Sequence, residues 1–216
     1  MKRRDFSLQL ASAGLGLAVA GPATAQGAPI EAKNYVKLQT VVPVALPSPQ
    51  KKIEVIEFFS YSCPHCFDLE PVLERWVKTL APDVYFRQVP VGFSLAYQMH
   101  QKLFFALEEI GQREALHRKV FGAIHQQRRP LNTEAEMLGF LTANGIDGAK
   151  FTDAFRSFAV NTKAARAKQL SEAYKLDGVP TLGIHGRYLT SASLAGSHER
   201  AVVVADYLIQ QVRQTL

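Results

Sequence analysis

The sequence Cys63-Pro64-His65-Cys66 contains the only two cysteines of the 216-residue chain, and it follows an apolar stretch, Ile53–Phe59. A nearly continuous apolar run of this length is typical of a strand that is covered on both faces. Two sulfurs separated by two residues can close a small ring or hold a metal, but they cannot crosslink distant parts of a fold. The motif therefore indicates chemistry before it indicates structure.

The position of the motif predicts two unequal sulfurs. Pro64 suits the first turn of a helix, which places Cys63 at the N-cap, where unpaired N–H groups and the helix dipole favour a thiolate. His65 adds an imidazole that can donate to the sulfur or attract it when protonated. Cys66 lies about one turn further in. We therefore expect an exposed Cys63 with a lowered pKa, and a Cys63–Cys66 disulfide from which the buried Cys66 leaves readily.

Three other interpretations of the pair are less favoured. A zinc site needs about four ligands, whereas the chain has two cysteines and its remaining histidines show no ligand spacing. Covalent haem attachment needs a histidine directly after the second cysteine, where this chain has Phe67. A structural disulfide would close too small a loop to restrict the unfolded chain strongly. The sequence therefore predicts redox chemistry with no metal and no cofactor.

The first 25 residues differ in kind from the rest. Lys2-Arg3-Arg4 precede an apolar run, Leu8–Ala20, and Ala23-Thr24-Ala25 offers the small residues that a signal peptidase requires. The run is too short to span a bilayer. Arg3-Arg4-Asp5-Phe6 also resembles a twin-arginine export signal, so both export routes stay open. We predict a signal peptide over residues 1–25, cleaved after Ala25, and export to an oxidising compartment.

The remaining composition is that of a globular protein, with 47% apolar and 20% charged residues in the full chain. Removing residues 1–25 takes away three positive charges and one negative charge, so the formal net charge falls from +6 to +4. The basic clusters Arg128-Arg129 and Lys163–Lys168 contain no interleaved aromatic residues. A nucleic-acid partner is therefore not expected.

Hydrophobic periodicity gives the order of the elements. Strands are expected at Tyr35–Val42, Ile53–Phe59, Val84–Val91 and Thr181–His185. A helix is expected after Pro64, and a turn followed by a last helix after His185. Between them lie helical patterns at Ser94–Ile110, Glu114–Gln126, Thr133–Asn144 and twice within residues 148–176, with a capping box at Thr133 and Glu136. This order predicts an α/β sheet interrupted by a helical insertion.

Three features together resemble the DsbA family of thiol:disulfide oxidoreductases, over residues 35–216. They are Phe58-Phe59-Ser60-Tyr61-Ser62-Cys63-Pro64-His65-Cys66, the helical block, and Gly178-Val179-Pro180-Thr181. The resemblance implies a thioredoxin fold in two parts, residues 26–92 and 177–216, with an all-helical insertion at 93–176. It also implies a monomeric periplasmic enzyme that introduces disulfides into reduced, unfolded exported polypeptides. A DsbB-like membrane quinone reductase would reoxidise it.

The resemblance assigns roles to further residues. It implies that Val179–Pro180 is a cis peptide beside the cysteines, with backbone groups of Val179 facing an extended substrate. It also implies that Glu57 has a raised pKa and exchanges a proton with Cys66. A basic residue on the neighbouring strand often partners this acid in the family, and only Arg87 is available here. Glu54 is expected to be an exposed carboxylate.

Other functions and other residues remain open at this stage. A reductase or isomerase is disfavoured by the Pro64-His65 dipeptide and by the lack of an obvious dimerisation domain, and a peptide-binding chaperone is the alternative outside enzymes. Four apolar side chains near the motif fit either a peptide groove or the core, and the core is favoured. They are Tyr61, Phe67, Phe93 and Met99.

Overall fold

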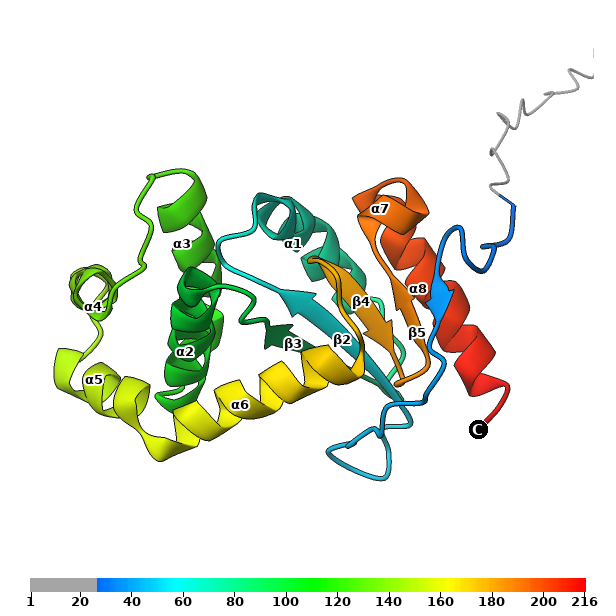
Figure 1. The fold of residues 1–216 in the computed structure, drawn as a ribbon, viewed down its shortest axis with the longest axis horizontal. Helices are drawn as coiled ribbons and strands as arrows, with labels where there is room; N and C mark the ends of the chain where they lie inside the picture. Colours follow the sequence, from blue (N-terminus) through cyan, green and yellow to red (C-terminus); the bar gives the residue numbers. More distant parts are fainter. Residues whose placement is uncertain (1–26) are drawn as a thin grey trace, which may run out of the picture.

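The computed structural model describes residues 27–216, so the predicted signal peptide lies outside the described residues. A five-stranded sheet with the order β1-β5-β4-β2-β3 forms its centre (Figure 1). The strands span Val36–Lys37 (β1), Ile53–Phe59 (β2), Val84–Pro90 (β3), Thr181–Ile184 (β4) and Tyr188–Thr190 (β5). Strand β2 pairs in parallel with β3 and antiparallel with β4. All seven of its residues are buried, as its apolar sequence predicts.

Three helices complete the sheet part of the molecule. They are α1 (Pro64–Val77), α7 (Ala192–Ala195) and α8 (His198–Arg213). Apolar residues of α1 and α8, among them Leu69 and Leu208, pack with Ile53 and Val55 of β2 in one core cluster. Pro64 is the first residue of α1, where its missing N–H costs no helical hydrogen bond. The end of β2 and the beginning of α1 are thereby fixed relative to each other.

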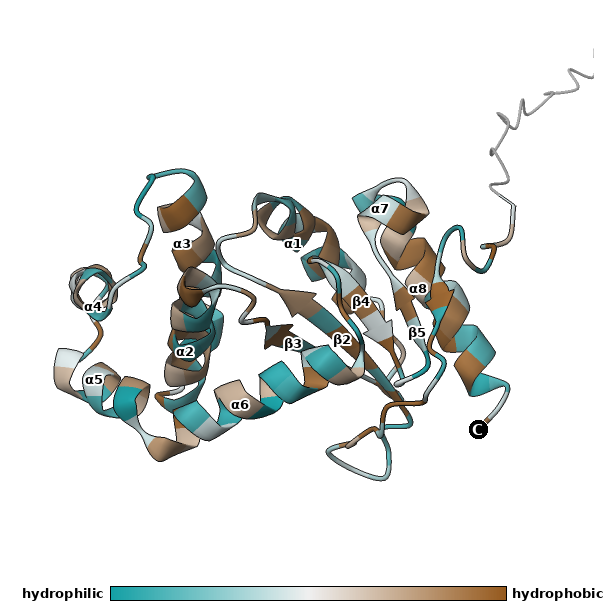
Figure 2. Cartoon of the chain, viewed as in Figure 1, coloured by the Kyte–Doolittle hydropathy of each residue, from teal (hydrophilic) through white to brown (hydrophobic). Residues whose placement is uncertain are grey.

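The helical block between β3 and β4 consists of α2 (Leu95–Glu109), α3 (Arg113–His125), α4 (Glu134–Ala143), α5 (Gly148–Arg156) and α6 (Phe158–Ala173). The predicted capping box of Thr133 and Glu136 is present at the start of α4. The connection between α3 and α4 is hydrophilic (Figure 2). None of the helices within residues 27–216 is long and apolar enough to cross a membrane.

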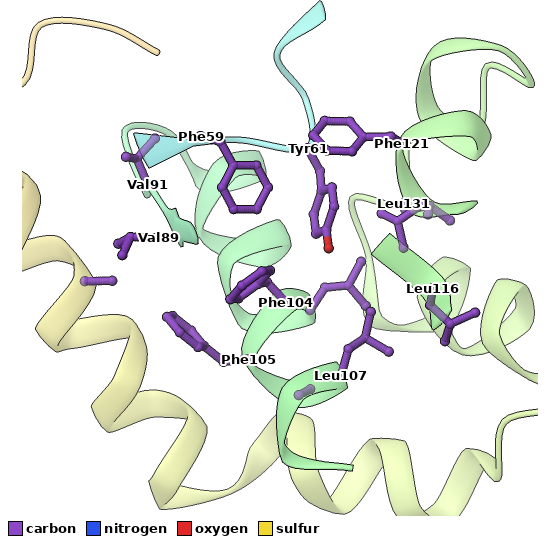
Figure 3. Packing of buried hydrophobic residues seen from close by; sticks show 14 of the residues in the cluster. Phe59, Tyr61, Val89, Val91, Phe104, Phe105, Leu107, Leu116, Phe121 and Leu131 are labelled. Carbon is purple, nitrogen blue, oxygen red and sulfur yellow. The ribbon is translucent and has the colours of Figure 1, made fainter. Parts of the chain in front are cut away.

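The helical block is tied to the sheet by buried aromatic residues. Phe59, at the end of β2, packs edge-on against Phe104 of α2 with 5.4 Å between ring centroids. Phe121 of α3 lies against Tyr61, with centroids 4.9 Å apart (Figure 3). On the other side of β2, the ring of Tyr174, just after α6, lies 4.9 Å from that of Phe58. The turn between β2 and α1 therefore lies where the two parts of the molecule meet.

Two local expectations are wrong. The strand expected over Tyr35–Val42 is only two residues long, Val36–Lys37, because the chain beyond it crosses the turn between β4 and β5, where Leu38 and Val42 donate to the carbonyl oxygens of Arg187 and Gly186. Strand β5 was not expected at all. It exists because His185 and Gly186 both adopt positive φ and reverse the chain. A side chain at Gly186 would collide with the Val42 carbonyl, so glycine is required there.

Candidate active site

The cysteine pair lies at the junction that the sequence predicts. Cys63 is the N-cap residue of α1, with extended backbone angles (φ −86°, ψ 116°), and Pro64 and His65 form the exposed start of the helix. The Cys66 N–H donates to the Cys63 carbonyl oxygen at 3.1 Å, which closes the first turn. Both cysteines are free thiols, so this is the geometry of the reduced pair.

Cys63 is less accessible than the sequence predicts. Its exposed fraction is 5%, compared with 0% for Cys66, so the order of the two sulfurs is as expected but the prediction of an exposed Cys63 is wrong. The loop before β4 covers the sulfur, since Cys63 Sγ lies 3.4 Å from the Val179 carbonyl oxygen. The Val179–Pro180 peptide is cis, as the resemblance implies.

The two thiols have opposite electrostatic environments. A hydrogen bond from Cys66, backbone N–H groups of Cys66 and His65, and the charge of His65 lower the pKa of Cys63 to about 6 despite its burial. Burial raises the pKa of Cys66 far above its usual value, and the neighbouring Cys63 and Glu57 raise it further. In the reduced pair at neutral pH, Cys63 is therefore largely thiolate and Cys66 remains a thiol.

Of the four candidate groove residues, three pack in or against the core and one, Phe93, lies at the surface. Tyr61 is wholly buried between the rings of Phe59 and Phe121 and belongs to the core (Figure 3). Phe93 is half exposed and stacks on Tyr97, with ring centroids 6.4 Å apart. Phe67 and Met99 are partly buried and pack against the core.

Tyr97 lies at the start of α2, next to Phe93. Burial is the main cause that raises the pKa of Tyr97, and the electrostatic effect of the cysteine pair adds to it. Leu95, at the start of α2, is 76% exposed. Phe93 and Leu95 are therefore exposed apolar side chains at the start of α2, and Tyr97 stacks against Phe93 there.

Glu57 lies at the centre of a buried polar cluster. Its Oε2 accepts a hydrogen bond of 2.8 Å from Gln88 Nε2, and its Oε1 has no hydrogen-bond partner among the described residues. The same Gln88 nitrogen lies 3.1 Å from Glu70 Oε1 of α1 and 3.1 Å from His117 Nε2 of α3. Burial, and then the charge of Glu70, raise the pKa of Glu57 well above its usual range.

Arg87 does not partner Glu57. It donates instead to Glu54 Oε1 at 2.9 Å, and Glu54 is 1% exposed, so the expectation of an exposed Glu54 is wrong. The register explains both results. Arg87 lies beside Ile56 of β2, on the sheet face that Glu54 shares, whereas Gln88 lies beside Glu57 and faces the other way.

Three histidines that the sequence did not assign to the site hold the turn before Cys63. His100 Nδ1 lies 2.8 Å from Ser62 Oγ, and its Nε2 donates to the carbonyl oxygens of Pro130 and Leu131. His125 Nε2 donates to the Tyr61 carbonyl oxygen at 2.8 Å. His117 binds the Tyr61 hydroxyl at 2.8 Å.

A signal for two of them exists in the sequence. His117, Phe121 and His125 recur every four residues and so share one face of α3, which is the face that packs on the active-site turn. The signal was missed because histidines at helical spacing are also compatible with a solvated helix face. Only the packing of α3 against the turn distinguishes the two.

The structure offers no competing site at the cysteines. Within residues 27–216, no group of three or more His, Cys, Asp or Glu side chains is arranged to hold a metal ion. A surface hollow of about 850 Å³ is lined by residues around Pro47 together with His185 and Leu216, and it does not include the cysteines.

Comparison with known proteins identifies this arrangement. The family model of the DSBA-like thioredoxin domain matches residues 54–202. The chain belongs to this family. A thiol:disulfide interchange protein DsbA of Bordetella pertussis is 42% identical over 217 residues, covering 99% of this chain and 100% of that protein. The DsbA of Pseudomonas aeruginosa is 40% identical over 181 residues, covering 84% of each protein.

Solved structures agree with the sequence comparison. The crystal structure of Pseudomonas aeruginosa DsbA has a TM-score of 0.81 and 38% sequence identity, and covers 87% of this chain and 96% of that chain. The oxidoreductase DsbA from Xylella fastidiosa has a TM-score of 0.79 and 27% identity. The predicted fold, an α/β thioredoxin fold with a helical insertion, is confirmed, and so is membership in a family of thiol:disulfide oxidoreductases.

Proposed function

We propose that this DsbA-family protein is a dithiol oxidase that introduces disulfides into reduced, unfolded exported polypeptides in the periplasm. The inequality of the two thiols carries the proposal. A pKa of about 6 at Cys63 stabilises the thiolate of the reduced pair, and whatever stabilises the reduced form makes the disulfide a stronger oxidant. The fold boundaries at residues 92 and 177 fit this proposal, because the cysteines and Pro180 then come from separate parts of the thioredoxin fold.

The reaction consists of two exchanges. A substrate thiolate attacks the Cys63 sulfur of a Cys63–Cys66 disulfide, the bond between the two enzyme sulfurs breaks, and Cys66 leaves with the bonding electron pair and takes up a proton. A second substrate thiolate then attacks the substrate sulfur of the mixed disulfide, and Cys63 leaves as a thiolate. Two electrons pass from the substrate dithiol to the enzyme, which ends as the reduced pair.

Each step has support in the geometry. The low pKa of Cys63 makes it a good leaving group in the second exchange, with Pro64 and His65 providing the helix start and the nearby charge. The raised pKa of Glu57 keeps a proton available for Cys66 when Cys66 leaves in the first exchange. Val179 presents its carbonyl group beside Cys63, where an extended substrate backbone would pass over Pro180.

A redox titration against glutathione tests the direction of electron flow. We expect the Cys63–Cys66 pair to be markedly more oxidising than thioredoxin, whose potential is about −270 mV. A value near that of thioredoxin would contradict the oxidase assignment and favour a reductase. The control is Cys63→Ser, which should lose the oxidation of a reduced peptide while keeping any suppression of aggregation, so a chaperone activity would remain visible.

Two parts of the proposal concern its surroundings. Turnover requires an external oxidant for the reduced pair, and we propose a membrane quinone reductase of the DsbB type, which would reach the cysteines over the apolar surface of Phe93 and Leu95. We also propose that the exported protein acts as a monomer after cleavage behind Ala25. Reoxidation by membrane vesicles that contain the reductase, compared with vesicles that lack it, tests the partner.

A further inference from the structure

His117 joins three elements that meet behind the cysteines. It is buried on α3, and its Nδ1 lies 2.8 Å from the Tyr61 hydroxyl of the active-site turn. Its Nε2 lies 3.1 Å from Glu70 Oε1 of α1 and 3.1 Å from Gln88 Nε2 of β3. Gln88 in turn donates to Glu57. The imidazole therefore connects the active-site turn to both carboxyl groups of the cluster.

The donors and acceptors around the ring favour one assignment of the ring protons. Burial raises the pKa of Tyr61 well above 10, so the phenol keeps its proton and donates it to His117 Nδ1. Nε2 then carries the ring hydrogen and donates to Glu70 Oε1, and the Gln88 amide, which is also a donor, donates to the same oxygen and not to the ring. An imidazolium would place a second hydrogen against the phenol, whose hydroxyl has no other partner within residues 27–216. The contacts therefore fit a neutral His117 that donates from Nε2.

This assignment makes the two carboxyl groups unequal. Glu70 receives donors from both His117 and Gln88, which favours its ionised form. Glu57 receives one donor, is fully buried and has an oxygen with no described partner. Two carboxylates that share one amide donor cannot both ionise without repulsion, so the proton of the pair belongs on Glu57.

We propose that His117 is the positioning residue that holds Glu70 as a hydrogen-bonded carboxylate and thereby keeps the active-site proton on Glu57, where it serves Cys66. The inference rests on the proposed function and deepens it. The ionisable groups that face this cluster come from every element packed around it. They are Glu57, Glu70, Tyr61, Arg113, Cys63 and Cys66, and Arg113 donates to Gln88 Oε1 at 3.3 Å.

Packing alone does not explain a histidine at this position. The ring of His117 lies among those of Phe59, Tyr61, Phe104 and Phe121, at centroid distances of 5.2 to 6.2 Å. A phenylalanine would make the same kind of contacts without burying two ring nitrogens. The imidazole differs from it only in the hydrogen bonds to Tyr61 and Glu70.

Three substitutions separate these hydrogen bonds. His117→Phe removes both and keeps an aromatic ring. His117→Gln places an amide near the Nε2 position and keeps the bond to Glu70, whereas His117→Asn places it near Nδ1 and keeps the bond to Tyr61. The readout is the titration of Glu57 and Glu70 in the oxidised protein, followed by NMR of carbon-13 labelled glutamate carboxyl groups, because the disulfide removes the cysteine titrations.

We expect His117→Phe and His117→Asn to lower the midpoint of Glu57 by about one pH unit, since Glu70 has lost a donor and competes for the proton. His117→Gln should keep wild-type midpoints. Peptide oxidation at pH 7 should slow about tenfold in His117→Phe and His117→Asn, and it should keep the wild-type rate in His117→Gln. Unchanged midpoints in His117→Phe, or a His117→Asn variant that behaves like wild type while His117→Gln does not, would overturn the proposal.

The control is Leu116→Ala, a neighbouring buried apolar position on α3 that makes no polar contact with the cluster. It should lower the unfolding temperature and leave both midpoints in place, and an equal shift there would mean that loosening of α3, not the hydrogen bond, sets the titration. A wild-type protein that fails to oxidise the peptide contradicts the proposed function, whereas the NMR midpoints still decide the role of His117.

Discussion

Glu54 and Glu57 lie three residues apart on β2, and each is at most 1% exposed, yet their surroundings are opposite in character. Glu54 faces Arg87, a cation at 2.9 Å. Glu57 faces Gln88, a neutral amide at 2.8 Å that it shares with a second carboxyl group, Glu70. Their partners are adjacent residues on β3 that point to opposite faces of the sheet.

The difference separates a structural acid from a chemical one. Burial raises the pKa of both carboxyl groups, but Arg87 opposes the shift at Glu54, whereas Glu70 adds to it at Glu57. A paired cation favours the carboxylate, and a shared amide beside a second acid favours one retained proton. The sheet thus carries an ion pair on one face and a proton store on the face of the cysteines.

The largest expected effect comes from removing the cation. Arg87→Met leaves Glu54 buried without its partner and should lower the free energy of unfolding by about 3 kcal/mol. Peptide oxidation should stay near the wild-type rate, because the Glu57 cluster lies on the other face. Urea unfolding of the oxidised protein measures the loss, and Arg87→Lys serves as the charge-preserving control. A loss below about 1 kcal/mol would contradict the structural role of the pair.

This contrast also shows what the sequence could and could not predict. The apolar run Ile53–Phe59 and the helical spacing after Pro64 predict β2 and α1 correctly, because periodicity reports burial directly. Strand β5 was not predicted from the sequence, because it is only three residues long and depends on positive φ at His185 and Gly186. Short paired segments created by a turn leave almost no periodic signal.

The site follows the same division. Cys63 and Cys66 were found from their spacing alone, and Glu57 from the family resemblance. The partners of the two acids were not found from the sequence. Whether Arg87 or Gln88 faces Glu57 depends on the register of β2 and β3, and a shift of one residue would exchange the two faces of the sheet. His117 escaped because its role depends on how α3 packs against the turn, over 50 residues away in sequence.

The second expected effect lies on the cysteine face. Glu57→Gln removes the proton store and should slow peptide oxidation about tenfold at pH 7, which corresponds to about 1.4 kcal/mol in the barrier. Stability should not fall, since the protonated carboxyl group and the amide that replaces it are both uncharged and of similar size. The matched variant Glu54→Gln should show the reverse pattern, with reduced stability and a normal rate. Equal behaviour of the two variants would contradict separate roles for Glu54 in stability and Glu57 in proton transfer.

The smallest expected effect is the loss of the amide. Gln88→Met removes a donor to Glu57 and should cost about 1 kcal/mol at neutral pH. Because the folded-state pKa of Glu57 is raised, its contribution to stability is fully present below the ordinary glutamate range, near 4.5, and is lost as the pH rises through the raised value.

Without Gln88, the pKa of Glu57 rises further, since the amide hydrogen bond favours the carboxylate. The stability difference between wild type and Gln88→Met should therefore be smallest near pH 4 and grow toward pH 8. Denaturant unfolding of the two oxidised proteins across this pH range measures the difference. In the oxidised form the cysteines are joined in a disulfide and do not titrate. A difference that stays constant with pH would mean that the amide only fills space, and that the charge of Glu57 does not depend on it.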